Sequence, residues 1–309
     1  MNYEKTFHPD GTYDVVIRDG VKEIGSGAFR DCIGLRRVTI PGSVKKIRSW
    51  VFQGCTGLTE VIIPMGVIVI GSYVFHGCTQ LREVTIPRSV KQIGLFAFLD
   101  CIGLTEITIP GGEEIGQGAF QGCTGLMRVI IPRGVKEIGT GTFKGCTQLT
   151  EVTIPGGVTE IGWYAFGGCT SLTKITIPGE VTEIFPGSFW GCTQLREVTI
   201  PGGVKKIGTG TFRGCTQLRE VTIPGGVKKI GKDAFFGCTG LRRVILPKHI
   251  SLEFPRLRQT RLTIHNLLHI PGESLLLIIL GFQKSGVPWE LIIIIIETLV
   301  NTNYRCLVA

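Results

Sequence analysis

The chain has 309 residues, of which 43% are hydrophobic and 18% charged, and its formal net charge is +9. This length and apolar content are ample for a buried core. The positive charge does not favour nucleic-acid binding, because basic residues alternate with acids, as in Arg82-Glu83, Lys136-Glu137 and Arg196-Glu197, and no run of five like charges occurs. We therefore expect a mixed, solvated surface.

A repeat organises most of the chain. The stretch Gly191–Gly208 recurs letter for letter as Gly214–Gly231, 23 residues later. Cysteines mark ten copies, with eight intervals of 23 residues and one of 22, at Cys32, Cys55, Cys78, Cys101, Cys123, Cys146, Cys169, Cys192, Cys215 and Cys238. A fixed period of this length predicts a solenoid in which each unit contacts only its neighbours, and argues against two ordinary globular domains.

The first 20 residues contain half of this unit. Val15-Val16-Ile17 matches the first strand of the repeat, and Val21-Lys22-Glu23-Ile24 supplies the second. We interpret residues 1–20 as an N-terminal cap, because terminal repeats are expected to be atypical. The stretch has no apolar leader segment, which favours a cytoplasmic protein.

Residues 21–250 hold the ten copies. Each has a Phe three residues before the Cys and a Leu three residues after it, then a Val or Ile, an alternate residue, another aliphatic and a Pro. In most copies Val-x-x-Ile-Gly follows a few residues later. Alternation of period two predicts a short strand with Val and Ile facing inward. The segment between Ile-Gly and Cys is short, and we expect a single helical turn anchored by the Phe. The interval of 22 residues arises at 109–115, where the second Val is missing next to a turn.

The outward positions of the first strand are mostly charged or Thr. In an extended face, these residues would contact a partner through charge and shape complementarity. The candidate partner-binding residues on this face are Arg37, Glu60, Glu83, Glu197 and Glu220.

Residues 50–96 depart from the polar pattern. Where most copies have Gly or another small residue, three consecutive copies have Trp50, Tyr73 and Phe96, and Tyr164 appears alone in a later copy. Stacking of the turns should bring the consecutive three into a row. The usually charged pair of the second strand becomes Ile68-Val69, and an outward Thr becomes Ile62. Exposed apolar patches often mark partner surfaces, so these six residues are candidate partner-binding residues. The alternative is that they fill gaps within the shell or reflect neutral drift.

The ten repeated Cys residues share one position within an apolar pattern. Their Cβ vectors should run parallel, so we expect a buried ladder of reduced thiols and no disulfide framework. No paired CxxC motif or phosphate loop occurs, and Pro271 interrupts the spacing of His265, His269 and Glu273. We expect no metal, no cofactor and no catalytic site.

The pattern dissolves after Pro247. Residues 251–309 contain the apolar runs Leu275–Phe282 and Leu291–Ile296, each too short for a spanning helix. We expect this segment to form a mostly helical C-terminal cap over the open end of the solenoid. A strand remains possible for the Ile-rich run, and residues 270–300 could alternatively contact a membrane or dock to a partner.

Together these motifs resemble the 23-residue leucine-rich repeat of BspA-like, or Treponema pallidum-type, proteins. The resemblance spans about three quarters of the chain. It implies an α/β repeat solenoid, a curved right-handed leucine-rich-repeat superhelix with a parallel β-sheet face. It also implies binding without catalysis, because characterised members are surface adhesins or ligand-binding scaffolds.

The sequence therefore predicts a non-catalytic scaffold that binds a protein partner of unknown identity. Nucleic acid is an improbable partner, and no feature indicates the oligomeric state. The alternatives are a membrane-associated protein and a cell-surface protein that binds a ligand or mediates adhesion.

Overall fold

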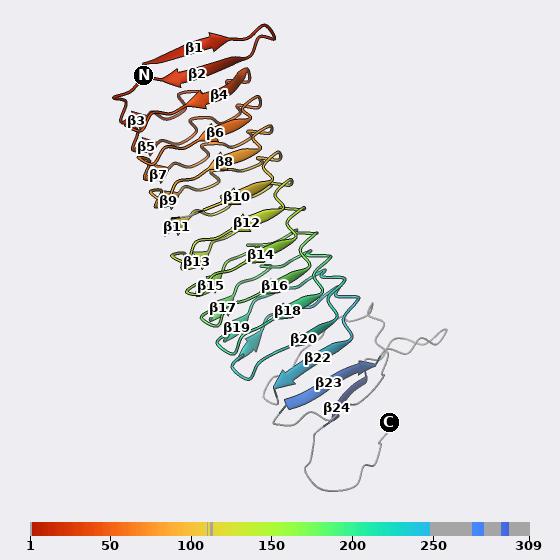
Figure 1. The fold of residues 1–309 in the computed structure, drawn as a ribbon. Helices are drawn as coiled ribbons and strands as arrows, with labels where there is room; N and C mark the ends of the chain where they lie inside the picture. The colour runs from red at the N-terminus through yellow and green to blue at the C-terminus, as the bar shows by residue number, and fades with distance from the viewer. Residues whose placement is uncertain (1, 110, 112–113, 248–273, 281–291, 297–309) are drawn as a thin grey trace.

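The computed structural model describes residues 2–109, 111, 114–247, 274–280 and 292–296, and the facts below concern these residues. The chain forms an elongated stack of turns that runs from β1 at the N-terminal end to β22 (Figure 1). Each turn contributes one strand to a first face and one to a second face, and a turn segment with the Phe and the Cys closes it. We call the third side, formed by these segments, the turn edge.

The first face consists of parallel strands that pair in register. It is built from β2 (Tyr13–Ile17), β4 (Leu35–Thr39), β6 (Glu60–Ile62), β8 (Glu83–Thr85), β10 (Glu106–Thr108), β12 (Arg128–Ile130), β14 (Glu151–Thr153), β16 (Lys174–Thr176), β18 (Glu197–Thr199), β20 (Glu220–Thr222) and β22 (Arg243–Pro247). In the three-residue strands the central Val or Ile is buried and both neighbours point outward, as the alternation predicts.

The second face is also parallel and consists of strands of two residues. It is built from β3 (Glu23–Ile24), β5 (Lys46–Ile47), β7 (Val69–Ile70), β9 (Gln92–Ile93), β11 (Glu114–Ile115), β13 (Glu137–Ile138), β15 (Glu160–Ile161), β17 (Glu183–Ile184), β19 (Lys206–Ile207) and β21 (Lys229–Ile230).

The short repeat interrupts both ladders. The described strands form one sheet up to β8 and another from β10 on the first face, and the second face divides between β11 and β13. The core nevertheless continues through this point, because the rings of Phe98 and Phe120 stack with centroids 5.2 Å apart. The breaks flank the turn that holds β10 and β11, which still pair with β12 and β9 across the 22-residue intervals, and the interior stack is continuous.

Two ladders of side chains fill the interior. The ten repeated phenylalanines, from Phe29 to Phe235, stack with neighbouring centroids 5.0–5.6 Å apart and ring planes within 17°. From Cys55 onward, each repeated thiol donates to the carbonyl oxygen of the Phe one turn earlier, with Sγ···O distances of 2.9–3.2 Å. All ten repeated Cys are free thiols. The Cys thus satisfies a buried carbonyl while filling a small space.

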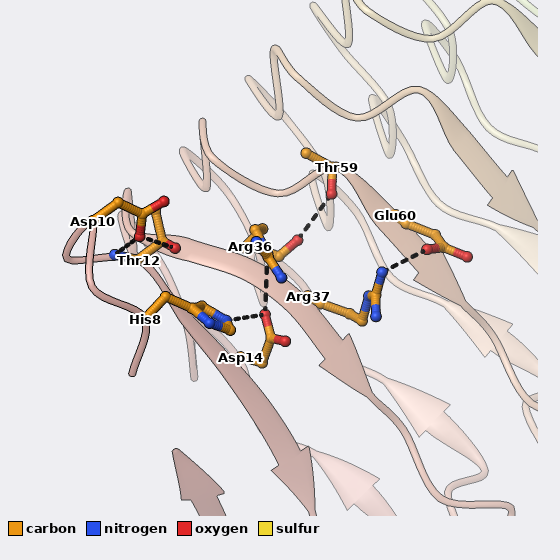
Figure 2. Close-up of polar contacts among 8 residues, drawn as sticks. All are labelled: His8, Asp10, Thr12, Asp14, Arg36, Arg37, Thr59 and Glu60. Carbon is orange, nitrogen blue, oxygen red and sulfur yellow. Dashed lines mark hydrogen bonds and ion pairs between the residues drawn. The ribbon is translucent and has the colours of Figure 1, made fainter. Parts of the chain in front are cut away.

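A β-hairpin covers the N-terminal end. Strand β1 (Tyr3–Phe7) pairs antiparallel with β2, and the Tyr3 ring lies edge-on to Phe29, with centroids 5.3 Å apart. In the hairpin turn, the Thr12 amide donates to Asp10 Oδ1 at 2.9 Å (Figure 2). The same figure shows Asp14 between His8 Nε2, at 3.3 Å, and Arg36 Nε, at 3.6 Å. This hairpin covers the first ring of the Phe ladder.

The expected helical parts are wrong for the described residues. The turn edge contains turns in place of a helical turn, because each segment has residues with positive φ, such as Gly210 at 60° and Gly214 at 75°, which a right-handed helix does not accommodate. No helix occurs in the described residues, so the α/β class is corrected to an all-β solenoid of about ten turns.

In the expected helical cap, the described residues are strands. β23 (Ser274–Leu280) pairs antiparallel with β22, and β24 (Ile292–Ile296) pairs antiparallel with β23. The β-branched and aliphatic runs favour extended backbone. The rest of 251–309, with His265 and His269, lies outside the described residues.

Candidate functional site

One position of the turn edge has positive φ in every copy. It is the third residue after the Ile of the second-face strand, and Gly occupies it in five of ten copies, as at Gly118 and Gly210 with φ of 61° and 60°. Trp50, Tyr73 and Phe96 occupy it with φ of 61°, 57° and 53°. Because L-residues rarely adopt this left-handed conformation, the aromatic residues lie where the backbone favours Gly.

The three aromatic side chains form a continuous stack, which we call the aromatic row. Ring centroids of Trp50 and Tyr73 are 6.4 Å apart, and those of Tyr73 and Phe96 are 5.2 Å apart. The Phe96 ring covers Gly118 in the next turn, because a Cβ on Gly118 would lie 2.2 Å from Phe96 Cε1. The sequence prediction that stacking turns bring these residues into a row agrees with this geometry.

The aromatic row is costly in backbone energy. A left-handed conformation costs an L-residue about 1–2 kcal/mol, whereas an aromatic pair contributes about 0.5–1.5 kcal/mol beyond the area it buries. The row has two stacked pairs for three strained residues. Stacking therefore recovers only part of the cost. The Tyr73 and Phe96 rings are also half-buried, which adds hydrophobic stabilisation. Backbone strain repeated at neighbouring surface positions is nevertheless a feature of functional sites.

Polar side chains border the aromatic row along the turn edge. Gln53 Nε2 lies 3.2 Å from His76 Nδ1, and His76 Nε2 lies 3.9 Å from Asp100 Oδ2. The His76 ring is edge-on to Tyr73, with centroids 5.9 Å apart. The row thus offers apolar surface and hydrogen-bonding groups side by side.

A groove of about 330 Å³ lies on the second face beside the aromatic row, between β5, β7 and β9. Its polar lining is formed by Lys46, Arg48, Ser49, Ser72 and Gln92, and Val69 contributes apolar surface. The Arg48 guanidinium is held by Glu23, with Nε···Oε1 and Nη2···Oε2 distances of 2.6 and 3.0 Å. These hydrogen bonds hold the pKa of the Glu23 carboxyl below its usual value. Sequence reasoning did not find this groove, because its walls come from three separate turns.

The other predicted apolar residues, Ile62, Ile68 and Val69, belong to one turn of the solenoid but lie on two different faces. Ile68 precedes β7 on the second face and is 44% exposed, whereas Ile62 ends β6 on the first face and is 61% exposed. Ile62 pairs in register with Thr39 and Thr85. Ile68 and Val69 therefore share a face with the groove, but Ile62 lies on a different face, and the predicted single patch is divided.

The predicted charged residues occupy the outward positions of the first face. Arg37 pairs with Glu60 (Figure 2), with Nη2 and Oε2 3.6 Å apart, and Glu60 lies directly beside Glu83 in the parallel register. Further along, Glu197 lies beside Glu220, and each has a basic partner, Lys174 at 3.6 Å and Arg243 at 3.3 Å. These pairs are exposed and contribute little to stability. They form a mixed face that lies away from the aromatic row.

Most of the chain matches the model of a known repeat family. The family model described as the BspA type leucine rich repeat region (6 copies) matches residues 3–127 and 113–242. The chain belongs to the BspA-type leucine-rich repeat family. Proteins with such repeats generally mediate protein interactions or adhesion.

Several solved structures are similar to this chain. A T. pallidum leucine rich repeat protein is 32% identical, with 55% of this chain and 87% of that chain covered and a TM-score of 0.48. A leucine-rich repeat protein from Bacteroides ovatus is 24% identical over 84% and 97%, with a TM-score of 0.40. The pneumococcal vaccine antigen PcpA is 20% identical over 77% and 64%, with a TM-score of 0.54, and shares the fold. A search of curated proteins finds no match.

The BspA-type repeats also carry aromatic residues that sequence reasoning missed. The sequence pattern indicates Tyr164 alone, but Trp163, Phe185 and Trp190 lie near it on the turn edge. The available signal was Trp163 at a position where two other copies have Thr140 and Thr209, and Trp190 where two others have Lys144 and Arg213.

Burial suppresses the reactivity of repeated thiols in this BspA-type core. Burial raises the pKa of Cys55 and of Cys192 to about 12, so each is a neutral thiol near pH 7 and a poor nucleophile. The part of the chain that the structure describes contains no group of three or more side chains that could hold a metal ion. It also contains no helix that could cross a membrane.

Proposed function

We propose that this chain is a non-catalytic scaffold that holds a protein partner against the aromatic row and the adjoining groove. The observation that carries the proposal is the presence of three consecutive aromatic side chains at positions where the backbone favours Gly. Contact with a binding partner would explain why the chain has this row despite its backbone strain.

The composition of the site suits a protein interface. Trp and Tyr are frequent at binding hot spots, and a hot spot is often surrounded by polar groups that exclude water. Here Trp50 is 43% exposed, and Ser49, Ser72 and Gln92 line the neighbouring groove. The exposed Ile68 and the half-buried Val69 extend the apolar surface across β7. We place the charged first face outside the main contact.

The test uses the residue that the repeat itself prefers. A variant with Trp50→Gly, Tyr73→Gly and Phe96→Gly removes the row and relieves the backbone, so loss of binding would not result from strain. The matched control is Asp233→Gly, which changes the same position of another copy, at φ 57°.

The wild type and both variants are immobilised, and proteins captured from the native lysate are identified and then purified for direct affinity measurement. We expect the control to retain the partner and the triple Gly variant to bind it at least about 30-fold more weakly, which is the effect of losing one hot-spot residue. Equal affinity for all three proteins would contradict the proposal.

A further inference from the structure

A second aromatic surface lies further along the turn edge. It consists of Trp163, Tyr164, Phe185 and Trp190, which we call the second aromatic cluster. Trp163 is 48% exposed, Tyr164 41% and Trp190 45%. The centroids of Trp163 and Phe185 lie 6.5 Å apart, and those of Tyr164 and Trp190 also lie 6.5 Å apart, with the second pair edge-on. Three large rings from two adjacent turns are thus presented to solvent.

The central ring of this cluster is fixed by the backbone around it. Tyr164 has φ of 51°, and its amide donates to the Pro186 carbonyl at 3.1 Å. Its ring covers the next turn, because a Cβ on Gly187 would lie 2.4 Å from Tyr164 Cε1. A strained aromatic residue is therefore held rigidly at the surface, so a ligand would meet it without an ordering cost.

The electrostatic surroundings differ from those of the aromatic row. The turn segments 116–123, 139–146, 162–169, 185–192 and 208–215 contain no Asp or Glu, whereas Asp31 and Asp100 lie in the segments near the row. Lys144 Nζ lies 5.7 Å from the Tyr164 ring centroid. Arg213 occupies the position of Trp190 one turn later and is exposed, with its guanidinium carbon 4.8 Å from the Phe236 ring centroid. The second aromatic cluster is therefore flanked by one cation on each side along the turn edge, and on the second face Lys206 Nζ, which pairs with Glu183, lies 6.0 Å from the Phe185 ring centroid.

We propose that the second aromatic cluster binds an acidic saccharide, a pyranose chain that carries carboxylate or sulfate groups. The C–H faces of a pyranose are apolar and can pack on aromatic rings, whose π faces attract polarised C–H groups. Lys144 and Arg213 would contact the anionic groups, and a guanidinium suits carboxylate and sulfate alike through two parallel hydrogen bonds.

The spacing favours an oligosaccharide. Lys144 and Arg213 are three turns apart, which corresponds to about 14 Å along the stack at one strand spacing per turn. An extended peptide would instead add to a free strand edge, but the amides of Tyr164, Phe166 and Gly168 already donate to neighbouring turns at 3.1, 2.8 and 2.6 Å. The cluster thus offers rings and cations without free backbone donors at these positions.

The probes are hyaluronan, which has carboxylates only, heparin, neutral amylose and polyglutamate. Binding is measured by affinity electrophoresis and by quenching of tryptophan fluorescence. The aromatic variant carries Trp163→Thr, Tyr164→Gly and Trp190→Gln, residues that other copies have at these positions, so its fold should persist. The charge variant carries Lys144→Gln and Arg213→Gln.

We expect hyaluronan or heparin to bind, and which of them binds distinguishes carboxylate from sulfate. Each variant should weaken that binding at least tenfold, and amylose should bind at least tenfold more weakly than the acidic polymer. The triple Gly variant of the aromatic row should bind normally, which separates this proposal from the protein-binding function.

A rival polyanion site is formed by exposed lysines on the second face, since Lys206 pairs in register with Lys229 and the Lys228 amide donates to the Lys205 carbonyl. The control variant is therefore Lys205→Gln, Lys228→Gln and Lys229→Gln. The proposal would be overturned if this variant lost binding while the aromatic variant kept it. Equal binding of polyglutamate, equal binding of amylose, or no binding of either acidic saccharide would also overturn it.

Discussion

Replacing Trp50 by Gly and by Ala separates backbone strain from the contribution of the ring. Both substitutions remove the stack on Tyr73, so the difference between them reports the backbone alone. At φ of 61° a Cβ costs about 1–2 kcal/mol, and the greater entropy of Gly in the unfolded chain offsets about 0.5–1 kcal/mol of this. We therefore expect Trp50→Gly to be more stable than Trp50→Ala by about 0.5–1 kcal/mol.

The assay is urea unfolding followed by circular dichroism, with the midpoint compared at equal slope. Ser49 is the matched control, because it is the preceding residue and does not have positive φ. There the order should reverse, with Ser49→Ala more stable than Ser49→Gly. If Trp50→Ala equalled or exceeded Trp50→Gly in stability, the strain argument for the aromatic row would be refuted.

Three further predictions concern the ladders and the Gly positions. Phe143→Ala should lower the free energy of unfolding by about 3–5 kcal/mol, because it removes a fully buried ring that stacks between two others. The control Thr153→Ala, at an exposed position, should change it by less than about 0.5 kcal/mol in the same urea titration. Gly118→Ala should destabilise the protein more than Gly210→Ala, because only a Cβ on Gly118 would meet an aromatic ring, that of Phe96. In a double-mutant cycle, Phe96→Gly should remove this extra destabilisation. If the extra destabilisation stayed unchanged, the packing of Phe96 on Gly118 would be contradicted. Buried Cys192 has its pKa raised to about 12, so the unfolded chain loses that proton first and stability should fall between about pH 8.5 and 12. Cys192→Ala should reduce this slope by up to about 1.4 kcal/mol per pH unit, and an unchanged slope would show that the thiol does not contribute.

Much of the fold follows from the sequence because the repeat imposes it. The inward Val and Ile of the strands, the Phe and the free Cys occupy their predicted interior positions, although Cys32 and Ile230 in the terminal copies are only partly buried. The helical turn was wrong because residues such as Trp50 and Gly54 require positive φ, and side-chain identity at Trp50 gives no sign of that conformation. The expected helical cap was wrong where β23 and β24 are described, although the Ile-rich run already favoured a strand.

The candidate site was predictable only in part. The spacing of Trp50, Tyr73 and Phe96 at one position per copy was sufficient to predict their stacking. The groove was not predictable, since residues as distant as Lys46 and Gln92 line it together. Ile62 was grouped with Ile68 because they are close in sequence, but a turn of the solenoid places them on different faces.

The central claim is that the aromatic row serves binding and not stability. The most direct test measures unfolding free energy and partner affinity together for the wild type and for the Trp50→Gly, Tyr73→Gly, Phe96→Gly variant. Relief of strain offsets part of the loss of the two stacks and of the half-buried rings. We therefore expect stability to fall by less than the contribution of one fully buried Phe, which is about 3–5 kcal/mol, while partner affinity falls at least about 30-fold. A variant that loses much more stability but binds the partner as tightly as the wild type would contradict the account.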